Sequence, residues 1–285
     1  MTKPMSVSSI SKSIAAFLPQ VCALALLGIC PQTASAQVIA SDNAGNSAYT
    51  TTFVGVDGGT GFAAWTAGTP GVDSGTYLGG TGLGARTFGI YSGNTGSMSV
   101  YRKFDNALRL ASGGNPGDTF RLDLGYTGVS SPNGRIGINL YSAGQWRLNF
   151  EFAGGDNVWR VKDNTGGSYA ATNIGWAGGT GWGDAAPDTF GSMLTFALTR
   201  GGSANEYKLD ISQGLATFST GSAFYSTGAG SGATSIDEVE IYTISQGADQ
   251  NVGFNNLEII PEPSSASLIG LGLAGLVALR KTRKA

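Results

Sequence analysis

The chain has 285 residues, of which 46 are glycine, and its 17 basic and 19 acidic side chains leave a net charge of −2. A hydrophobic content of 41% is enough for a packed core, which argues against a disordered chain. The absence of histidine excludes Ser-His-Asp and Cys-His catalysis and every histidine-ligated metal site.

The first 36 residues have the parts of a secretory signal peptide. Basic residues precede an apolar run over 14–30, and Ala34 and Ala36 supply the small side chains of a cleavage site. We therefore predict a signal helix over 1–36 that meets the Sec translocon and signal peptidase, with Gln37 as the first mature residue. An uncleaved N-terminal anchor is the alternative. Both cysteines lie inside this segment, so the mature chain would have no thiol, disulfide or cysteine-ligated zinc.

From residue 37 to residue 260 the apolar residues alternate with a period of two, as in strands with one buried face. The pattern is clearest at 119–126, 135–141, 145–152 and 206–212. Short strands at this spacing predict a single domain over 37–260, which is an all-β, antiparallel two-sheet sandwich of the jelly-roll or concanavalin A-like lectin type. A barrel is the second choice.

Turn signals separate these segments. The Asn-Gly pair within 131–135 predicts a hairpin turn, and 141–146 predicts a second hairpin. Trp146 and Trp159 alternate in phase with apolar neighbours, so we expect both in the core.

The last predicted strand, over 251–260, changes phase along its length. Phe254 belongs to one phase and Leu257 to the other, with Asn255 and Asn256 between them. A bulge at the two asparagines would restore one buried face, so we predict a bulge there.

Carboxylates are the first candidates for chemistry, since a glycosidase needs only two of them. Glu151, Glu238 and Glu240 lie on predicted strands, and a solvated outer face opposite Val239 and Ile241 is the simpler interpretation of Glu238 and Glu240. Asp57 and Asp156 lie in glycine-rich loops that could join a structural calcium site, although neither fits a defined calcium loop. We expect no catalytic residues, no resident cofactor and no enzymatic activity.

Tryptophans in glycine-rich loops are the second candidates, because an aromatic face can stack on a sugar ring. Trp65, Trp176 and Trp182 could form such a platform for polysaccharide, or they could close the ends of the sandwich. A nucleic-acid partner is not expected. Residues 37–260 carry 11 Lys and Arg against 18 Asp and Glu, a net charge of −7.

Three features follow one another in the last 25 residues. Pro261, Glu262 and Pro263 precede an apolar run over 268–279, which lengthens to 264–279 when small polar residues are included. The run is short for a permanent bilayer span, which usually needs about 20 residues. Basic residues follow it and would stay on the cytoplasmic side; they are Arg280, Lys281, Arg283 and Lys284.

This order of triplet, short apolar helix and basic end resembles the PEP-CTERM sorting signal. The resemblance implies that residues 261–285 insert transiently in the inner membrane, that an exosortase processes the chain near the triplet, and that a Gram-negative bacterium exports it to its surface or exopolysaccharide matrix. An ordinary membrane anchor is the alternative for this tail.

We therefore predict a non-enzymatic, exported protein of the cell surface or of a biofilm matrix. A glycan-binding module is the alternative, and a carboxylate-dependent glycoside hydrolase is a weaker one.

Overall fold

The computed structural model describes residues 38–80, 83–105, 117–164, 168, 170–175, 192–201, 206–220, 224–225, 236–247 and 250–261. The strands in this part of the chain are β1 (Ala40–Asp42), β2 (Thr66–Ala67), β3 (Gly75–Gly79), β4 (Thr87–Tyr91), β5 (Ser97–Lys103), β6 (Thr119–Tyr126), β7 (Arg135–Ser142), β8 (Gln145–Ala153), β9 (Val158–Asp163), β10 (Ala170–Gly175), β11 (Ser192–Arg200), β12 (Glu206–Gln213), β13 (Ala216–Ser219), β14 (Phe224–Tyr225), β15 (Glu238–Ile244) and β16 (Asn251–Ile260).

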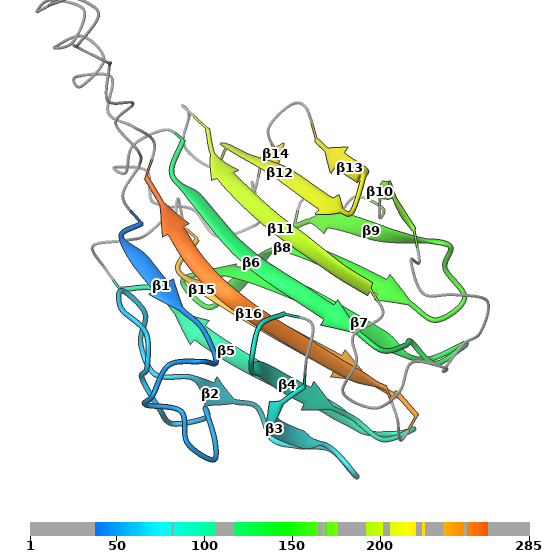
Figure 1. Cartoon of the computed structure of the whole chain (residues 1–285). Coiled ribbons are helices and arrows are strands. Elements are labelled where there is room, and N and C mark those ends of the chain that lie inside the picture. Colours follow the sequence, from blue (N-terminus) through cyan, green and yellow to red (C-terminus); the bar gives the residue numbers. More distant parts are fainter. Residues whose placement is uncertain are drawn as a thin grey trace, which may run out of the picture. The chain divides into compact units, whose positions relative to one another are not determined.

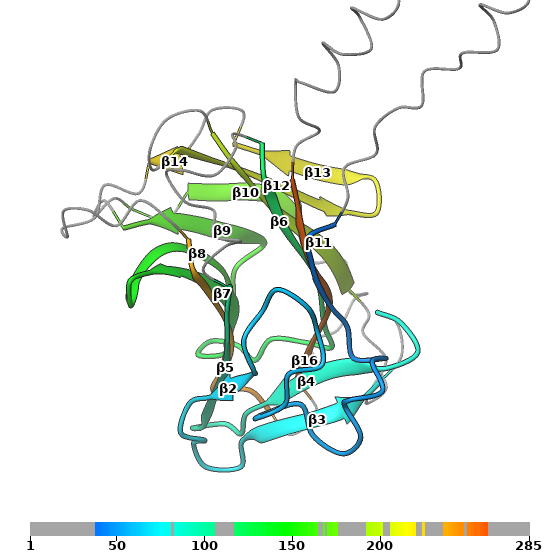
Figure 2. The same ribbon diagram turned by 90° about the vertical axis from the view of Figure 1, so that its left-hand side faces the viewer.

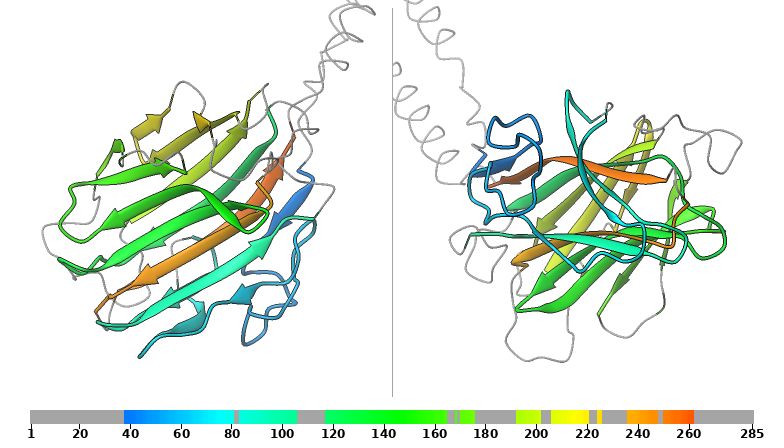
Figure 3. Two further views of the ribbon diagram at one scale, coloured as in Figure 1. Left: turned by 180° about the vertical axis from the view of Figure 1, so that it is seen from behind. Right: turned by 90° about the horizontal axis from the view of Figure 1, so that it is seen from below.

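Two antiparallel sheets face each other, as predicted (Figures 1 and 2). The nine-stranded sheet has the order β13-β12-β11-β6-β16-β4-β3, with β1 paired to β16 and β14 paired to β12. The seven-stranded sheet has the order β10-β9-β8-β7-β15-β5-β2 and is seen in front in the left view of Figure 3. All strands lie within the unit Gln37–Glu262. The predicted domain limits at 37 and 260 remain predictions.

The period-two pattern selects the buried faces. In β6 the apolar residues Phe120, Leu122 and Leu124 are fully buried, while the residues between them lie on the outer face. The same alternation holds in β7. Most of the aromatic side chains that the structure describes are buried, and among them Phe150 stacks on Trp159 with ring centroids 4.4 Å apart. The core position predicted for Trp159 is confirmed.

The two predicted hairpins have different outcomes. The connection between β7 and β8 is a two-residue turn, in which Ala143 and Gly144 have φ of 50° and 75°, as a primed hairpin turn requires. A turn also forms at 131–134, but it joins β6 to β7, which belong to different sheets. The hairpin predicted there is therefore wrong, because an Asn-Gly pair fixes a local reversal and not the strand that follows it.

The bulge predicted near the end of the chain is confirmed. The pairing of β16 with β6 shifts register between Asn255 and Glu258, and Asn256 has a φ of 52°. Phe254 and Leu257 are consequently both buried. A second irregularity in the pairing of β7 with β8 lies beside Trp146. Trp146 is only half-buried, so its predicted core position is wrong.

A buried ion pair joins the two sheets. Arg102 on β5 approaches Asp42 on β1 with 3.1 Å between Nη2 and Oδ2, and both side chains are inaccessible to solvent. The same Oδ2 accepts hydrogen bonds from the Tyr49 hydroxyl at 2.7 Å and from Trp65 Nε1 at 3.0 Å. This carboxylate therefore has three donors inside the sandwich, which offset part of the cost of its removal from water; burial still raises the pKa of Asp42 above its ordinary value.

Candidate functional site

The predicted sorting triplet begins where the last strand ends. β16 stops at Ile260, and Pro261 is the next residue that the structure describes. Glu262, Pro263, the apolar run and the four basic residues after it lie outside the described residues. The predicted signal segment and its cleavage residues, Ala34, Ala36 and Gln37, also lie outside them.

The predicted tryptophan platform requires a correction. Trp65 has no solvent-accessible surface and packs against Phe53, Phe88 and Phe254, with ring centroids between 5.1 and 5.6 Å apart. Its indole N–H is directed to Asp42 inside the sandwich. Trp65 is therefore a core residue and not a sugar platform, because residues far away in the sequence cover its ring. Trp176 and Trp182 lie outside the described residues.

The candidate carboxylates lie on the outer face of the seven-stranded sheet, but this face is not simply solvated. Glu151 on β8 is 3% exposed and Glu240 on β15 is 7% exposed. A run of side-chain hydrogen bonds connects them across three strands. Asn139 Nδ2 donates to Glu240 Oε2 at 2.8 Å, and Asn149 Nδ2 donates to Asn139 Oδ1 at 2.7 Å and to the Tyr242 hydroxyl at 3.0 Å. The Tyr242 hydroxyl in turn donates to Glu151 Oε2 at 2.9 Å.

A glycine makes room for part of this network. Gly137 on β7 lies directly between Glu151 and Tyr242 in the sheet. A Cβ at position 137 would lie 2.5 Å from the tyrosine hydroxyl and 2.6 Å from the carbonyl oxygen of Phe150. The missing side chain therefore lets the Tyr242 ring lie across β7 and reach the carboxylate on β8.

Glu151 is further neutralised by arginine. The Arg160 Nη2 atom lies 2.5 Å from Glu151 Oε1, and Arg135 Nη1 lies 3.7 Å from Oε2. Internal donors thus approach both oxygens of this carboxylate. The arrangement explains how a carboxylate can be buried on an outer sheet face without a ligand.

A pocket of about 490 Å³ opens at one end of this face. Its lining comes from β5, β7, β15, the β7–β8 turn, and β2 with the segment before it. The residues are Ala63, Ala64, Thr66, Tyr101, Lys103, Tyr141, Gly144 and Glu238. Glu238 and Lys103 are cross-strand partners. Burial raises the pKa of Glu238 above its ordinary value, and the ammonium of Lys103 opposes this shift without cancelling it. Sequence reasoning identified Glu238 but missed the tyrosines, because their strands meet only in the folded sheet.

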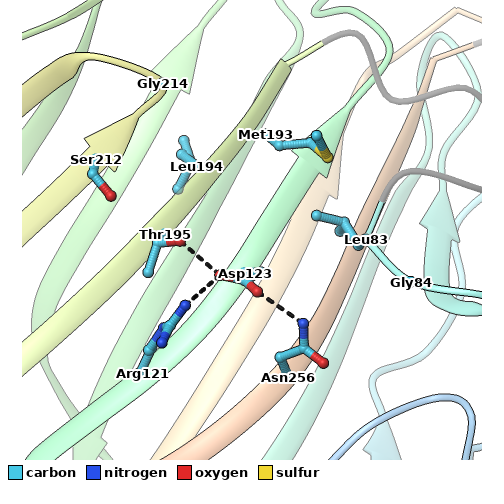
Figure 4. A pocket seen from close by; sticks show the side chains of 10 residues that line it. All are labelled: Leu83, Gly84, Arg121, Asp123, Met193, Leu194, Thr195, Ser212, Gly214 and Asn256. Atoms are coloured by element: carbon cyan, nitrogen blue, oxygen red, sulfur yellow. Dashed lines mark hydrogen bonds and ion pairs between the residues drawn. The ribbon is translucent and has the colours of Figure 1, made fainter.

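A second pocket, of about 470 Å³, lies on the outer face of the nine-stranded sheet (Figure 4). At its centre, the oxygens of Asp123 accept hydrogen bonds from the Thr195 hydroxyl at 2.7 Å and from Asn256 Nδ2 at 2.8 Å. The Arg121 guanidinium lies 3.8 Å from the same carboxylate. The bulge in β16 therefore brings Asn256 to the outer face, where its side chain donates a hydrogen bond to the Asp123 carboxylate.

The aspartates suggested as calcium ligands face guanidinium groups instead. Asp57 Oδ1 lies 3.1 Å from Arg102 Nη2, and Asp156 Oδ2 lies 3.0 Å from Arg160 Nε. Within the described residues no group of three or more acidic, cysteine or histidine side chains could hold a metal ion. In the same part of the chain, no helix has the length and apolar character that crossing a bilayer requires.

Comparisons with known proteins find one family and several solved structures. The sequence matches the PEP-CTERM protein-sorting motif over residues 260–284, and no curated protein matches it. A legume lectin-like domain from Entamoeba histolytica is 8% identical, with a TM-score of 0.42, over 65% of this chain and 89% of that one. The CBM2 module of the evolved Dit of Lactobacillus casei BL23 phage J-1 is 12% identical, with a TM-score of 0.42, over 81% of this chain and 98% of that one.

A third structure is the binding domain of botulinum neurotoxin serotype C1, which is 10% identical, with a TM-score of 0.44, over 83% of this chain and 51% of that one. The chain spans about half the length of the neurotoxin binding domains that it matches. At such scores these likenesses add no argument about a ligand. The family match agrees with the order of the triplet, the apolar run and the basic residues. The chain therefore carries a PEP-CTERM protein-sorting motif, which follows an antiparallel two-sheet β-sandwich in the sequence.

Proposed function

We propose that this chain is a non-enzymatic protein that is exported through the Sec translocon, processed by an exosortase next to the Pro261-Glu262-Pro263 triplet, and released to the cell surface or exopolysaccharide matrix. The observation that carries the proposal is the sorting motif over residues 260–284. Its apolar run is short for a permanent span, which favours a temporary stop in the membrane. The sandwich is of the jelly-roll or concanavalin A-like lectin type in this proposal.

The absence of enzymatic activity is part of the proposal. Glu151 and Glu240, the buried carboxylates of the outer face, accept hydrogen bonds from neighbouring side chains. A retaining or inverting glycosidase would need two carboxyl groups directed at one glycosidic bond. Neither of these residues lines the two pockets described above. We expect no release of reducing sugar from bacterial or plant polysaccharides.

Mass spectrometry of the mature protein tests the sorting proposal. The full chain is expressed in a Gram-negative host that contains an exosortase and in the same host with the exosortase deleted. We expect secreted protein that begins at Gln37 and lacks peptides from 268–279. In the deletion host the tail peptides should remain, in the membrane fraction.

A variant in which Pro261, Glu262 and Pro263 are all alanine provides the matched control, since it keeps the apolar run and the basic end. In the host that contains the exosortase, this variant should keep its tail peptides and stay in the membrane fraction, as the parent chain does in the deletion host. Tail peptides in the bulk of the secreted parent protein would overturn the proposal. A tail that stays in the membrane in both hosts would favour the ordinary anchor.

A further inference from the structure

The pocket at the end of the seven-stranded sheet has features that sorting does not require. Two tyrosine rings, Tyr101 on β5 and Tyr141 on β7, line it from opposite sides of β15, with ring centroids 6.4 Å apart and planes inclined by 59°. Its volume of about 490 Å³ falls within the range of about 300–1,000 Å³ that is typical of small-molecule sites.

Hydrogen bonds position both rings: the Tyr101 hydroxyl accepts one of 3.1 Å from Ser99 Oγ, and a buried carboxylate holds Tyr141. Glu240 accepts a hydrogen bond of 2.6 Å from the Tyr141 hydroxyl and one of 2.8 Å from Asn139 Nδ2. Burial raises the pKa of Tyr101 and Tyr141, and the neighbouring Glu240 raises both further, so both phenols stay neutral. The pocket thus presents aromatic rings whose orientation is fixed before any ligand arrives, which lowers the entropy cost of binding.

A donor and an acceptor lie side by side in the same lining. Lys103 and Glu238 are directly opposite each other on β5 and β15. Lys103 is exposed and Glu238 is partly buried, and the charge of the ammonium acts on the carboxylate across the two strands. Their charges cancel, so the pocket offers one ammonium donor and one carboxylate acceptor without a net preference for ions.

The chemistry of the lining selects the ligand class. A sugar ring has an apolar face of C–H groups that stacks on an aromatic ring, and its adjacent hydroxyls both donate and accept hydrogen bonds. A polyanionic sugar is disfavoured, because residues 37–260 carry a net charge of −7.

We infer that this pocket binds one residue of an uncharged saccharide, which stacks on a tyrosine and shares its adjacent hydroxyls between Lys103 and Glu238. The inference goes beyond the sorting function and does not rest on it. A failure of exosortase processing leaves it untouched.

Isothermal titration calorimetry on the full chain in mild detergent tests the inference. The probes are the neutral hexasaccharides maltohexaose, cellohexaose, laminarihexaose and N-acetylchitohexaose, with hexagalacturonate as the anionic comparison. We expect at least one neutral probe to bind with a Kd of about 1 mM or lower. Tyr141→Ala and Lys103→Met should each weaken it about tenfold, the loss expected for one stacking contact or one charged hydrogen bond.

Two matched variants on the other sheet serve as controls. Tyr91→Ala removes a partly exposed tyrosine from β4, and Lys208→Met removes a surface ammonium from β12. Both should bind as the parent does. Lys103 is exposed, so its variant decides the test if Tyr141→Ala does not fold.

Three outcomes would overturn the inference. One is that no neutral probe binds, and another is that hexagalacturonate alone binds. The third is a loss for the control variants equal to that for Tyr141→Ala and Lys103→Met.

Discussion

Two adjacent asparagines in β16 should differ sharply in their effect on stability. Asn255 is buried; its Oδ1 accepts from the backbone N–H of Ala44 at 2.8 Å, and its Nδ2 donates to the carbonyls of Leu83 and Arg86 at 2.7 and 2.9 Å. Asn255→Ala removes all three hydrogen bonds, so the N–H of Ala44 and the carbonyls of Leu83 and Arg86 lose this side chain as a partner. At about 1 kcal/mol for each bond, we expect the free energy of unfolding to fall by about 3 kcal/mol.

Asn256→Ala is the matched control. Asn256 is exposed, and within the described residues its side chain donates to Asp123, so its loss costs little beyond placing alanine at a φ of 52°. We expect the free energy of unfolding of that variant to fall by about 1 kcal/mol.

Urea unfolding and thermal melts of the full chain measure both variants. For a domain of this size, the loss in Asn255→Ala corresponds to a fall in Tm of about 6–12 °C. Equal losses within about 0.5 kcal/mol would refute the reasoning, because they would mean that the buried side-chain bonds contribute no more than an exposed one.

Three further predictions concern the buried polar groups. Gly137→Ala would place a Cβ 2.5 Å from the Tyr242 hydroxyl, and we expect urea unfolding to show a loss of about 2–3 kcal/mol as the ring leaves its carboxylate. Arg102→Met leaves the Asp42 carboxylate buried without its cation, and the same assay should show a loss of about 3–5 kcal/mol. The raised pKa of Glu238 means that the folded chain binds more protons than the unfolded chain, so this group lowers stability as pH rises through that pKa. Thermal melts should therefore give Glu238→Gln a higher Tm than the parent at pH 7, and this difference in Tm should vanish near pH 3.

Each of these predictions has its own check. Gly79→Ala places a Cβ 3.9 Å from the Tyr77 ring and should be near neutral, so an equal effect at Gly137 would contradict the steric argument. Lys208→Met breaks a surface pair with Asp210 and should cost at most about 1 kcal/mol; a similar value for Arg102→Met would contradict the buried-pair argument. If the Tm of Glu238→Gln exceeds that of the parent by the same amount at every pH, the proton linkage is ruled out.

Local patterns in the sequence were sufficient for several features of the fold. The alternation in 119–126 predicts β6 with its buried face, because the side-chain period of a strand is two whatever its neighbours are. The phase slip between Phe254 and Leu257 predicts the bulge for the same reason. The sorting motif is also a local signal, since it consists of three features in order along 25 residues.

Features that depend on distant partners were not accessible in the same way. Trp65 stands in a glycine-rich segment that is typical of a loop, yet Phe88 and Phe254 cover it from elsewhere in the chain. The Asn-Gly turn at 131–134 was recognised, but the turn sequence does not specify that β7 joins the opposite sheet.

The sequence by itself determined the strand pattern, the bulge and the sorting motif, because each depends on neighbours a few residues away. The tertiary structure decided which polar side chains come together. Asn139 and Glu240, and likewise Tyr101 and Tyr141, lie far apart along the chain and meet only because β7, β15 and β5 are adjacent in one sheet. Strand order follows from burying both apolar faces of the whole chain at once, and no single segment contains that information.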